Sequence, residues 1–418
     1  MRKMLLAGCA LALATGFAAP RIDRDEVRIS NEAGRVTIDY VLRDDPAIVT
    51  FSIETNAGDS AWVALPGTVV KTFSGDGNCL VPSTGPKRIV WKASRDWPNV
   101  KLGPDTLRAS VRAYARDRAP KWMTVNLDVR GAVNYFDTDE ALPFAPTDRI
   151  WKTDRMLLRR IPAAFVEWRM GHAPGENGIG TTGWDWTQET PHRVTLTYDY
   201  YMAVYMLTQR QYVKITGKTN PSLFATPCDV CGETAESVAM RPVERVSYAD
   251  AVLSDSGPVA RMRAWTGNDT FNVPSAAEWE YACRAGCSHA LYTCRELAQD
   301  GYLNRDDGLD EIAWYGADFG PDSGNSHGHP HAVGEKAPNA WGLYDMLGNL
   351  EERTRDWHRQ DLGTADQVDP DNSRDQAGSG GHTTYGGHYG RPAHRVRACC
   401  QNYYEGAAEC CGMRLMCR

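Results

Sequence analysis

The chain has 418 residues, of which 24% are charged and 42% are hydrophobic, and its formal net charge is −7 at pH 7. That length is enough for two domains, each with a core of its own. The acidic excess argues against a nucleic-acid partner, and no polybasic patch for a membrane surface is present. The 38 glycines, 13 tryptophans and 18 tyrosines favour a loop-rich, aromatic fold over a helical bundle.

The first 18 residues have the pattern of a signal peptide. Arg2 and Lys3 supply the basic start, residues 4–17 form a short apolar run, and small residues favour cleavage after Ala18. A lipoprotein is the less favoured alternative, because residues 6–9 read LAGC but the apolar run before Cys9 is too short. No later segment approaches the roughly 18 apolar residues of a membrane helix. The sequence therefore predicts a secreted, periplasmic or cell-surface protein.

Residues 20–130 are predicted to form a β-sandwich of the Ig-like kind. Segments 27–30, 35–41, 48–53, 89–91 and 107–114 alternate in polarity or are rich in β-branched residues. Turn residues separate them at the spacing of a sandwich. No catalytic constellation occurs here, which favours a spacer or adhesion module. Residues 131–155 contain Gly131, Pro143 and Pro146, which break any period, and are predicted to be a linker.

Three segments of the remaining chain resemble the formylglycine-generating enzyme, or sulfatase-modifying factor, family. Residues 339–352 read NAWGLYDMLGNLEE, residues 273–286 read VPSAAEWEYACRAG, and residues 386–389 and 412–414 read GGHY and GMR. They resemble the family's N-x-W/Y-G-L-Y-D-M-x-G-N-V-W-E-W, L-P-T-E-A-E-W-E-Y-A-x-R-G and R-G-G-S-W…G-F-R, in the same order. The resemblance covers residues 156–418 and implies a C-type-lectin-like α+β fold with few short helices and strands.

Within this domain, strands are predicted at residues 165–171 and 191–196. One helix is predicted to begin after Thr208 as its N-cap, and another at Ser247. A third helix, at residues 275–285, is predicted to point Glu278 and Arg284 outward. The inward residues of that helix are Trp279, Ala282 and Cys283.

Two other motifs have the residue types of metal sites. Cys228 and Cys231 form a CxxC, but a structural zinc site needs four ligands, and no second pair at matching spacing exists. Removal of Cys9 leaves eleven of the twelve cysteines, and an exported chain usually pairs them, so a local disulfide or pairing with Cys283, Cys287 or Cys294 is favoured over zinc. Residues 327–331 read HGHPH, where glycine and proline favour a solvated turn over a transition-metal site.

The family resemblance also implies a structural calcium ion. Its ligands map onto the carboxylates of Asp345 and Glu352 and the backbone carbonyls of Met346, Gly348 and Leu350, which are the oxygen donors that Ca²⁺ prefers. The alternative is that Asp345 and Glu352 only cap turns. The family's W-E-W is replaced here by residues 351–353, EER, so both flanking aromatic residues are lost.

The enzymes of the family oxidise a sulfatase cysteine to formylglycine with oxygen and one Cu(I), which two thiolates hold. The family's copper-cysteine positions are Arg391 and Val396 in this chain, and neither side chain binds Cu(I). Cysteines at 399, 400, 410 and 411 lie nearby, but adjacent residues usually project apart and a vicinal disulfide is strained. Copper is therefore not expected.

The closing segment carries diverse side chains between residues that match the family scaffold. This pattern resembles the variable proteins of diversity-generating retroelements, which use the fold as a ligand-binding platform; drift on a non-catalytic domain would look similar. Tyrosine and arginine are favoured in binding surfaces. We expect ligand contacts from His388, Tyr389, Arg391, His394, Tyr403 and Tyr404, although Tyr403 and Tyr404 could instead be core residues.

The sequence thus predicts an exported, non-catalytic protein that binds a protein or glycan ligand through its C-terminal surface. One alternative is a copper- and oxygen-dependent formylglycine-generating oxidoreductase that acts on sulfatase cysteines. The other alternative is a structural component of the cell envelope.

Overall fold

The computed structural model describes residues 19–56, 61–100, 102–103, 105–172, 176, 186–228, 232–298, 304–316, 324–374 and 380–418. The predicted signal peptide and Cys9 lie outside these residues. The chain divides into two compact units, one of Met1–Leu65 with Val69–Ala119 and one of Pro66–Thr68 with Pro120–Arg418. Within the described ranges, no helix has the length and apolar character needed to cross a membrane.

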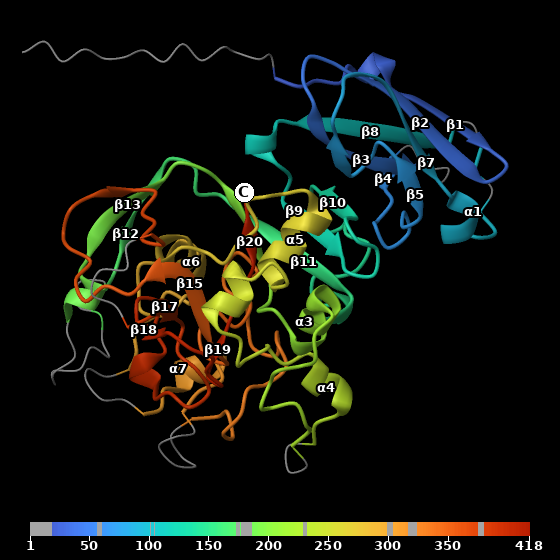
Figure 1. The fold of residues 1–418 in the computed structure, drawn as a ribbon. Helices are drawn as coiled ribbons and strands as arrows, with labels where there is room; N and C mark the ends of the chain where they lie inside the picture. The colour runs from blue at the N-terminus through green and yellow to red at the C-terminus, as the bar shows by residue number, and fades with distance from the viewer. Residues whose placement is uncertain are drawn as a thin grey trace, which may run out of the picture. The chain divides into compact units, whose positions relative to one another are not determined.

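The first unit is built mainly from β-strands (Figure 1). Its elements are η1 (Arg24–Glu26), β1 (Arg28–Glu32), β2 (Arg35–Leu42), β3 (Ala47–Thr55), β4 (Val63–Ala64), β5 (Phe73–Gly75), β6 (Cys79–Val81), β7 (Gly85–Trp91), α1 (Ala93–Asp96), β8 (Leu107–Tyr114) and η2 (Arg116–Arg118). One antiparallel sheet has the order β1-β2-β7-β5, and in the other β3 pairs with β4, β6 and β8. Strands occur at all five predicted places.

Alternating polarity explains how these strands share one core. Along β2, every second side chain is buried, which places Val36, Ile38 and Tyr40 inside. Phe51 of β3 belongs to the same hydrophobic cluster, so side chains of both sheets form one core. The Ig-like topology stays a prediction.

The second unit is a mixed α and β domain with few helices and many strands (Figure 1). Its strands are β9 (Trp122–Asn126), β10 (Val133–Phe136), β11 (Arg155–Ile161), β12 (Val166–Met170), β13 (His192–Leu196), β14 (Tyr200–Ala203), β15 (Glu351–Trp357), β16 (Gln367–Val368), β17 (His382–Tyr385), β18 (Gln401–Tyr404), β19 (Cys411–Gly412) and β20 (Met416–Cys417). They form sheets of order β10-β9-β11-β14-β20, β12-β13-β16 and β18-β17-β15-β19.

The helices and helical turns of this unit are α2 (Ile150–Thr153), η3 (Trp186–Glu189), α3 (Gln209–Thr216), α4 (Ala235–Ala239), η5 (Ala249–Leu253), α5 (Pro258–Thr266), α6 (Ala276–Arg284), α7 (Asp307–Asp310) and η7 (Ala393–Arg395). Thr208 caps α3, as predicted, by accepting a hydrogen bond from the backbone N–H of Gln211. The helix expected at Ser247 is a π-helical turn, η5, and the helix α5 follows it from Pro258 onward.

The structure differs from the predicted linker at residues 131–155. β10 and α2 lie inside that range and belong to the second unit, together with β9, which the prediction assigned to the sandwich. β9 pairs with β11 from Arg155↔Asn126 to Arg159↔Trp122. Gly131 and the prolines interrupt local periodicity, but they do not prevent this pairing between distant strands.

The outward orientation predicted for Glu278 and Arg284 is wrong. Both side chains are buried, because α6 packs against β15 and β17 and each charge finds a partner there or nearby (Figure 1). The Glu278 carboxylate accepts a hydrogen bond from Arg355 at 2.6 Å, and Arg284 donates to Glu280 at 2.8 Å. Helical periodicity suggested that these charged side chains face solvent, but it carries no information about the partners that allow them to be buried.

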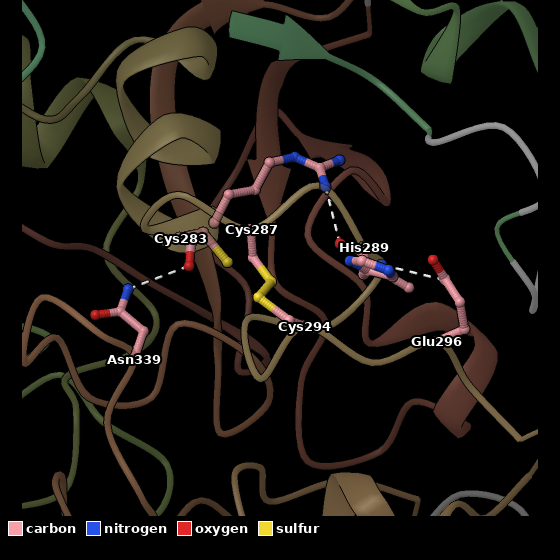
Figure 2. Close-up of a disulfide and its surroundings, with 8 residues drawn as sticks. Cys283, Cys287, His289, Cys294, Glu296 and Asn339 are labelled. Atoms are coloured by element: carbon pink, nitrogen blue, oxygen red, sulfur yellow. Dashed lines mark hydrogen bonds between the residues drawn. A yellow bond between two sulfur atoms is a disulfide. The ribbon is translucent and has the colours of Figure 1, made fainter.

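Figure 2 shows the loop that follows α6, where Cys287 and Cys294 form a disulfide. The side-chain amide of Asn339 donates to the carbonyl of Cys283 at 3.1 Å, which anchors the start of residues 339–352 to the end of α6. The expectation that Cys228 or Cys231 pairs with Cys287 or Cys294 is therefore wrong. Cys231 itself lies outside the described residues.

Candidate functional site

Residues 339–352 form a loop that runs into β15 and is buried over most of its length. Leu343, Met346 and Leu347 lie in its largest hydrophobic cluster. The backbone turns through positive φ at Gly348, where a Cβ atom would lie 2.5 Å from the carbonyl oxygen of Trp314. Glycine is therefore required at this close approach. The N–H of Gly348 donates to the carbonyl of Gly386 at 2.8 Å, which joins the loop to the closing segment.

Glu352 and Arg414 form a buried ion pair behind this loop. Arg414 Nη2 lies 2.7 Å from Glu352 Oε1, and the side chains are 0% and 1% exposed. Trp279 Nε1 donates to Glu352 Oε2 at 2.9 Å. Both carboxylate oxygens of Glu352 are thus engaged by protein donors, which does not suit the calcium ligand that the sequence predicts at this position.

Asp345 differs from Glu352 because its charge is less well balanced. Its Oδ2 accepts the Gly334 N–H at 2.7 Å, and burial raises the pKa of the carboxyl to about 6. A cation beside Asp345 would offset that burial. Of the predicted calcium ligands, this leaves Asp345 and the carbonyls of Met346, Gly348 and Leu350, and the ion and its site stay a prediction.

The two family copper positions carry side chains with other partners. Arg391 is half-buried, and its Nε lies 3.3 Å from Glu351 Oε1. Val396 is fully buried in the main hydrophobic cluster. Glu351 stands where the family has the first tryptophan of W-E-W. Arg391 and Glu351 therefore pair with each other, and both occupy positions where this chain differs from the family motif.

Glu351 is the centre of a polar group that we call the Glu351 cluster. Thr384 Oγ1 donates to Glu351 Oε2 at 2.6 Å, Asn402 Nδ2 lies 3.4 Å from Oε1, and His388 Nε2 lies 4.0 Å from Oε1. The cluster consists of Glu351, Thr384, His388, Arg391, Asn402 and Tyr404. It joins β15, β17 and β18 with the turn that follows Gly387.

Electrostatics keep Arg391 charged and Tyr404 protonated. Burial lowers the pKa of Arg391, but the nearby Glu351 and Tyr404 outweigh it, so that its pKa is raised. Burial, with a further contribution from Glu351, raises the pKa of the Tyr404 hydroxyl. The Tyr404 hydroxyl lies 3.4 Å from Arg391 Nη2 and 3.1 Å from Asn402 Nδ2. The cluster therefore offers fixed hydrogen-bond donors.

Three of the six residues expected to contact a ligand are buried. Tyr389 packs edge-on against the ring of Phe224 at 5.4 Å between centroids, and His388 and His394 are also buried. These three belong to the interior, in the segment that follows the positive-φ turn at Gly386 and Gly387.

Arg391, Tyr403 and Tyr404 are the expected contacts that solvent reaches. Tyr403 is 43% exposed, and its ring stacks on that of His358 at 4.4 Å between centroids. Tyr404 and Arg391 are half-buried. Arg391 and Tyr404 lie close to one another in the Glu351 cluster. Tyr403 is the neighbour of Tyr404 on β18, which is an edge strand of its sheet. The reading of Tyr403 as a core residue is therefore wrong.

Sequence reasoning missed Glu351, Thr384 and Asn402 as members of the site. Glu351 had one available signal, since it replaces an aromatic residue of the family motif. Arg353, which replaces the second aromatic residue, is buried and donates to the carbonyls of Val246, Tyr404 and Gly406. Both replacements thus contribute polar contacts to the closing segment.

A domain with few helices, built around this glycine-rich loop and its buried Arg–Glu pair, belongs to the class of sulfatase-modifying factors. Residues 169–418 match the sulfatase-modifying factor enzyme 1-like domain, and the chain is a member of this FGE-sulfatase family. The family resemblance found in the sequence is confirmed.

Two curated proteins show the extent of the likeness. The chain is 28% identical over 203 residues to "Chaperone protein LppX" of Paenibacillus barcinonensis, covering 40% of this chain and 64% of that protein. It is 29% identical over 183 residues to the formylglycine-generating enzyme of Mus musculus, covering 41% of this chain and 43% of that enzyme. The chain thus spans less than two thirds of the length of these relatives.

Two solved structures are also similar. Treponema denticola variable protein 1 has a TM-score of 0.45 and 24% identity, covering 63% of this chain and 95% of that chain. PvdO from Pseudomonas aeruginosa has a TM-score of 0.42 and 22% identity, covering 63% of this chain and 94% of that chain.

Proposed function

We propose that this chain is an exported, non-catalytic member of its family that binds a protein or glycan ligand through the outer face of the Glu351 cluster and β18. The observation that carries the proposal is the Arg391–Glu351 pair at a family copper position. A guanidinium has no lone pair to give to Cu(I), and its permanent charge opposes a bound cation.

The nearby cysteines do not supply an obvious replacement. The Cys399 sulfur lies 3.3 Å from a carboxylate oxygen of Glu176 and of Glu189, and burial raises its pKa. Burial likewise raises the pKa of Cys400 and of Cys411. Because the thiolate is the metal ligand, thiols with raised pKa values are poorly prepared to hold copper.

The exposed part of the site has the composition of a recognition surface. Tyr403 offers a large, rigid ring, and Arg391 offers forked donors whose orientation Glu351 fixes. Asn402 adds an amide beside the Tyr404 hydroxyl. Such a mixture suits the apolar faces and hydroxyl groups of a glycan or the polar rim of a protein.

The ligand proposal is tested by screening the purified protein against a glycan array and a library of displayed surface proteins. We expect Tyr403→Ser and Arg391→Ala to lower the affinity for any hit at least tenfold. Phe165→Ser is the matched control, because Phe165 is an exposed aromatic residue outside this surface. A hit whose affinity neither site variant changes would contradict the proposal.

The diversified closing segment remains a hypothesis about the gene. Diversification would be restricted at three buried positions, His388, Tyr389 and His394. Only side chains that fit the interior would allow the domain to fold there. A search of the surrounding DNA for a template repeat that differs only at adenines, together with a reverse transcriptase, tests the idea. If both are missing, the hypothesis fails and drift explains the segment.

Calcium, the Ig-like spacer and export complete the proposal. Asp345 and the carbonyls of Met346, Gly348 and Leu350 would hold the ion, whose role would be to fix the loop. The first unit would act as a spacer. The alternative activity, copper-dependent formation of formylglycine, is favoured by the formylglycine-generating enzymes among the relatives.

A further inference from the structure

Two sequence motifs that were each too small for a metal site meet in the structure. Cys228 comes from the CxxC, and His329 comes from the HGHPH segment. With Glu233, which immediately precedes the N-cap of α4, they bring one sulfur, one carboxylate oxygen and one ring nitrogen within 4.8 Å of one another. Neither motif alone supplied this set of donors.

The Glu233 carboxylate is held so that its two oxygens have different roles. Oε2 accepts from the guanidinium of Arg241 and, at 2.8 Å, from the backbone N–H of Cys228. Oε1 lies 4.0 Å from Nδ1 of His329. One oxygen is thus fixed by neighbouring donors while the other faces the histidine, which is how metal-binding carboxylates are commonly oriented.

His329 is buried and its ring is also positioned by the backbone. Its Nδ1 lies 3.0 Å from the carbonyl oxygen of Pro330 and 3.3 Å from Nη2 of Arg241. A hydrogen bond from Nδ1 to that carbonyl places the lone pair on Nε2, and a backbone carbonyl is a usual partner of a metal-binding histidine. Arg241 is tied to the carbonyl of Phe224 at 3.0 Å, so it acts as a fixed neighbour of the carboxylate.

Sulfur, nitrogen and oxygen donors together suit Zn²⁺. Bond lengths of about 2.0–2.3 Å in a tetrahedral site imply ligand-to-ligand distances of about 3.3–3.8 Å. The donor atoms of this group lie within 4.8 Å of one another, so the widest separation can exceed that range. Closing the group therefore requires the widest ligand-to-ligand distance to shrink by at most about 1.0–1.5 Å, which side chains on loops can achieve.

We propose that Cys228, Glu233 and His329 bind a zinc ion, with water as the fourth ligand. The ion would tie the segment before α4 to the segment that leads into residues 339–352. A second group within the described residues also contains three donors, Cys287, His289 and Cys294, but its two sulfurs form a disulfide (Figure 2). That pairing leaves the group without the thiolates that zinc needs.

The test begins with full-length protein that has been stripped with a chelator and then titrated with Co²⁺ and with Zn²⁺. Cobalt bound to a thiolate gives a charge-transfer band in the near ultraviolet. We expect wild type to develop that band, to retain one zinc ion per chain after gel filtration, and to melt at a higher temperature with zinc than without it. Wild type that retains no zinc, or retains zinc without the cobalt band, would overturn the proposal.

Variants assign the ligands. Cys228→Ser is expected to abolish the cobalt band, and His329→Gln to weaken zinc binding at least tenfold. His327→Gln is the matched control, since His327 lies two residues away in the same motif and is exposed. Cys287→Ser controls for the disulfide sulfurs and should keep the band. Equal loss in His327→Gln and His329→Gln, or a band that survives Cys228→Ser, would overturn the proposed ligand set.

Discussion

At the scale of single residues, the second unit depends on charges that are buried in pairs. Arg414–Glu352 is the clearest case, since both side chains are essentially inaccessible and Trp279 donates to the same carboxylate. Arg414 also donates to the carbonyls of Ala203 and Val204, at 2.9 and 2.7 Å. The pair therefore links the buried loop, β14 and the end of the chain.

Removal of one charge from this pair should be costly. Glu352→Gln leaves the Arg414 guanidinium buried without its counter-charge, and we expect a loss of about 3–5 kcal/mol in the free energy of unfolding. Glu167→Gln, in the exposed pair with Arg193, should cost about 0–1 kcal/mol. Urea unfolding of both variants measures the difference, and equal losses would show that burial of the pair is not the cause.

His382 gives a prediction for acid stability. Its ring stacks between Tyr248 and Trp357, at 3.5 and 4.1 Å, and burial lowers its pKa to about 4 from 6.5. Because the unfolded chain takes up the proton first, the stability present above pH 6.5 is lost as the pH falls toward 4. His382→Phe should reduce this slope by about 1.4 kcal/mol per pH unit in urea unfolding curves. An unchanged slope would exclude His382 as a contributor.

At the scale of elements, the sequence predicted a helix correctly where neighbouring residues alone determine where it begins. Thr208 and Ser275 begin α3 and α6 as expected, because an N-cap needs only its own side chain and the next turn. The strands β9 and β10 were missed, because β9 is held by pairing with the more distant β11, and β10 in turn pairs with β9. Periodicity carries no information about such a partner.

The buried loop at residues 339–352 is the element on which calcium can be tested. At a hundredfold excess over Kd, a bound ion adds about 2.7 kcal/mol, which is a rise of about 4 °C in Tm for a unit of this size. Asp345→Asn is the matched variant, since asparagine tolerates the positive φ at this position. We expect calcium to raise the Tm of wild type in thermal melts and to leave the variant unchanged. A wild-type Tm that is the same in calcium and in chelator would count against the ion.

Most residues of the candidate site could not be predicted from the sequence. The motif at residues 339–352 located Asp345 and the loop, and the departure from cysteine at Arg391 indicated what the site lacks. The partner of that arginine, Glu351, could not be inferred, because the two residues lie on different segments. The zinc group was hidden for the same reason, since Cys228 and His329 become neighbours only in the folded chain.

At the scale of the whole molecule, the division between the units is itself testable. A fragment of residues 120–418 retains β9 and β10 and should unfold cooperatively. A fragment that begins at 156, the boundary expected from the sequence, removes both strands and the first residue of β11, leaving β11 without one of its neighbours. We expect the shorter fragment to aggregate or to melt without a cooperative transition. Equal thermal melts for both fragments would contradict the assignment of residues 120–155 to the second unit.

We propose that this chain binds a ligand and does not oxidise a cysteine, because Arg391 and Val396 stand at the positions of the family's copper ligands. The measurement that tests it most directly is mass spectrometry of a CxPxR peptide after incubation with the reduced protein, Cu(I) and oxygen, with a formylglycine-generating enzyme as positive control. We expect the peptide cysteine to stay unmodified. Formation of the formylglycine aldehyde by wild type would contradict it.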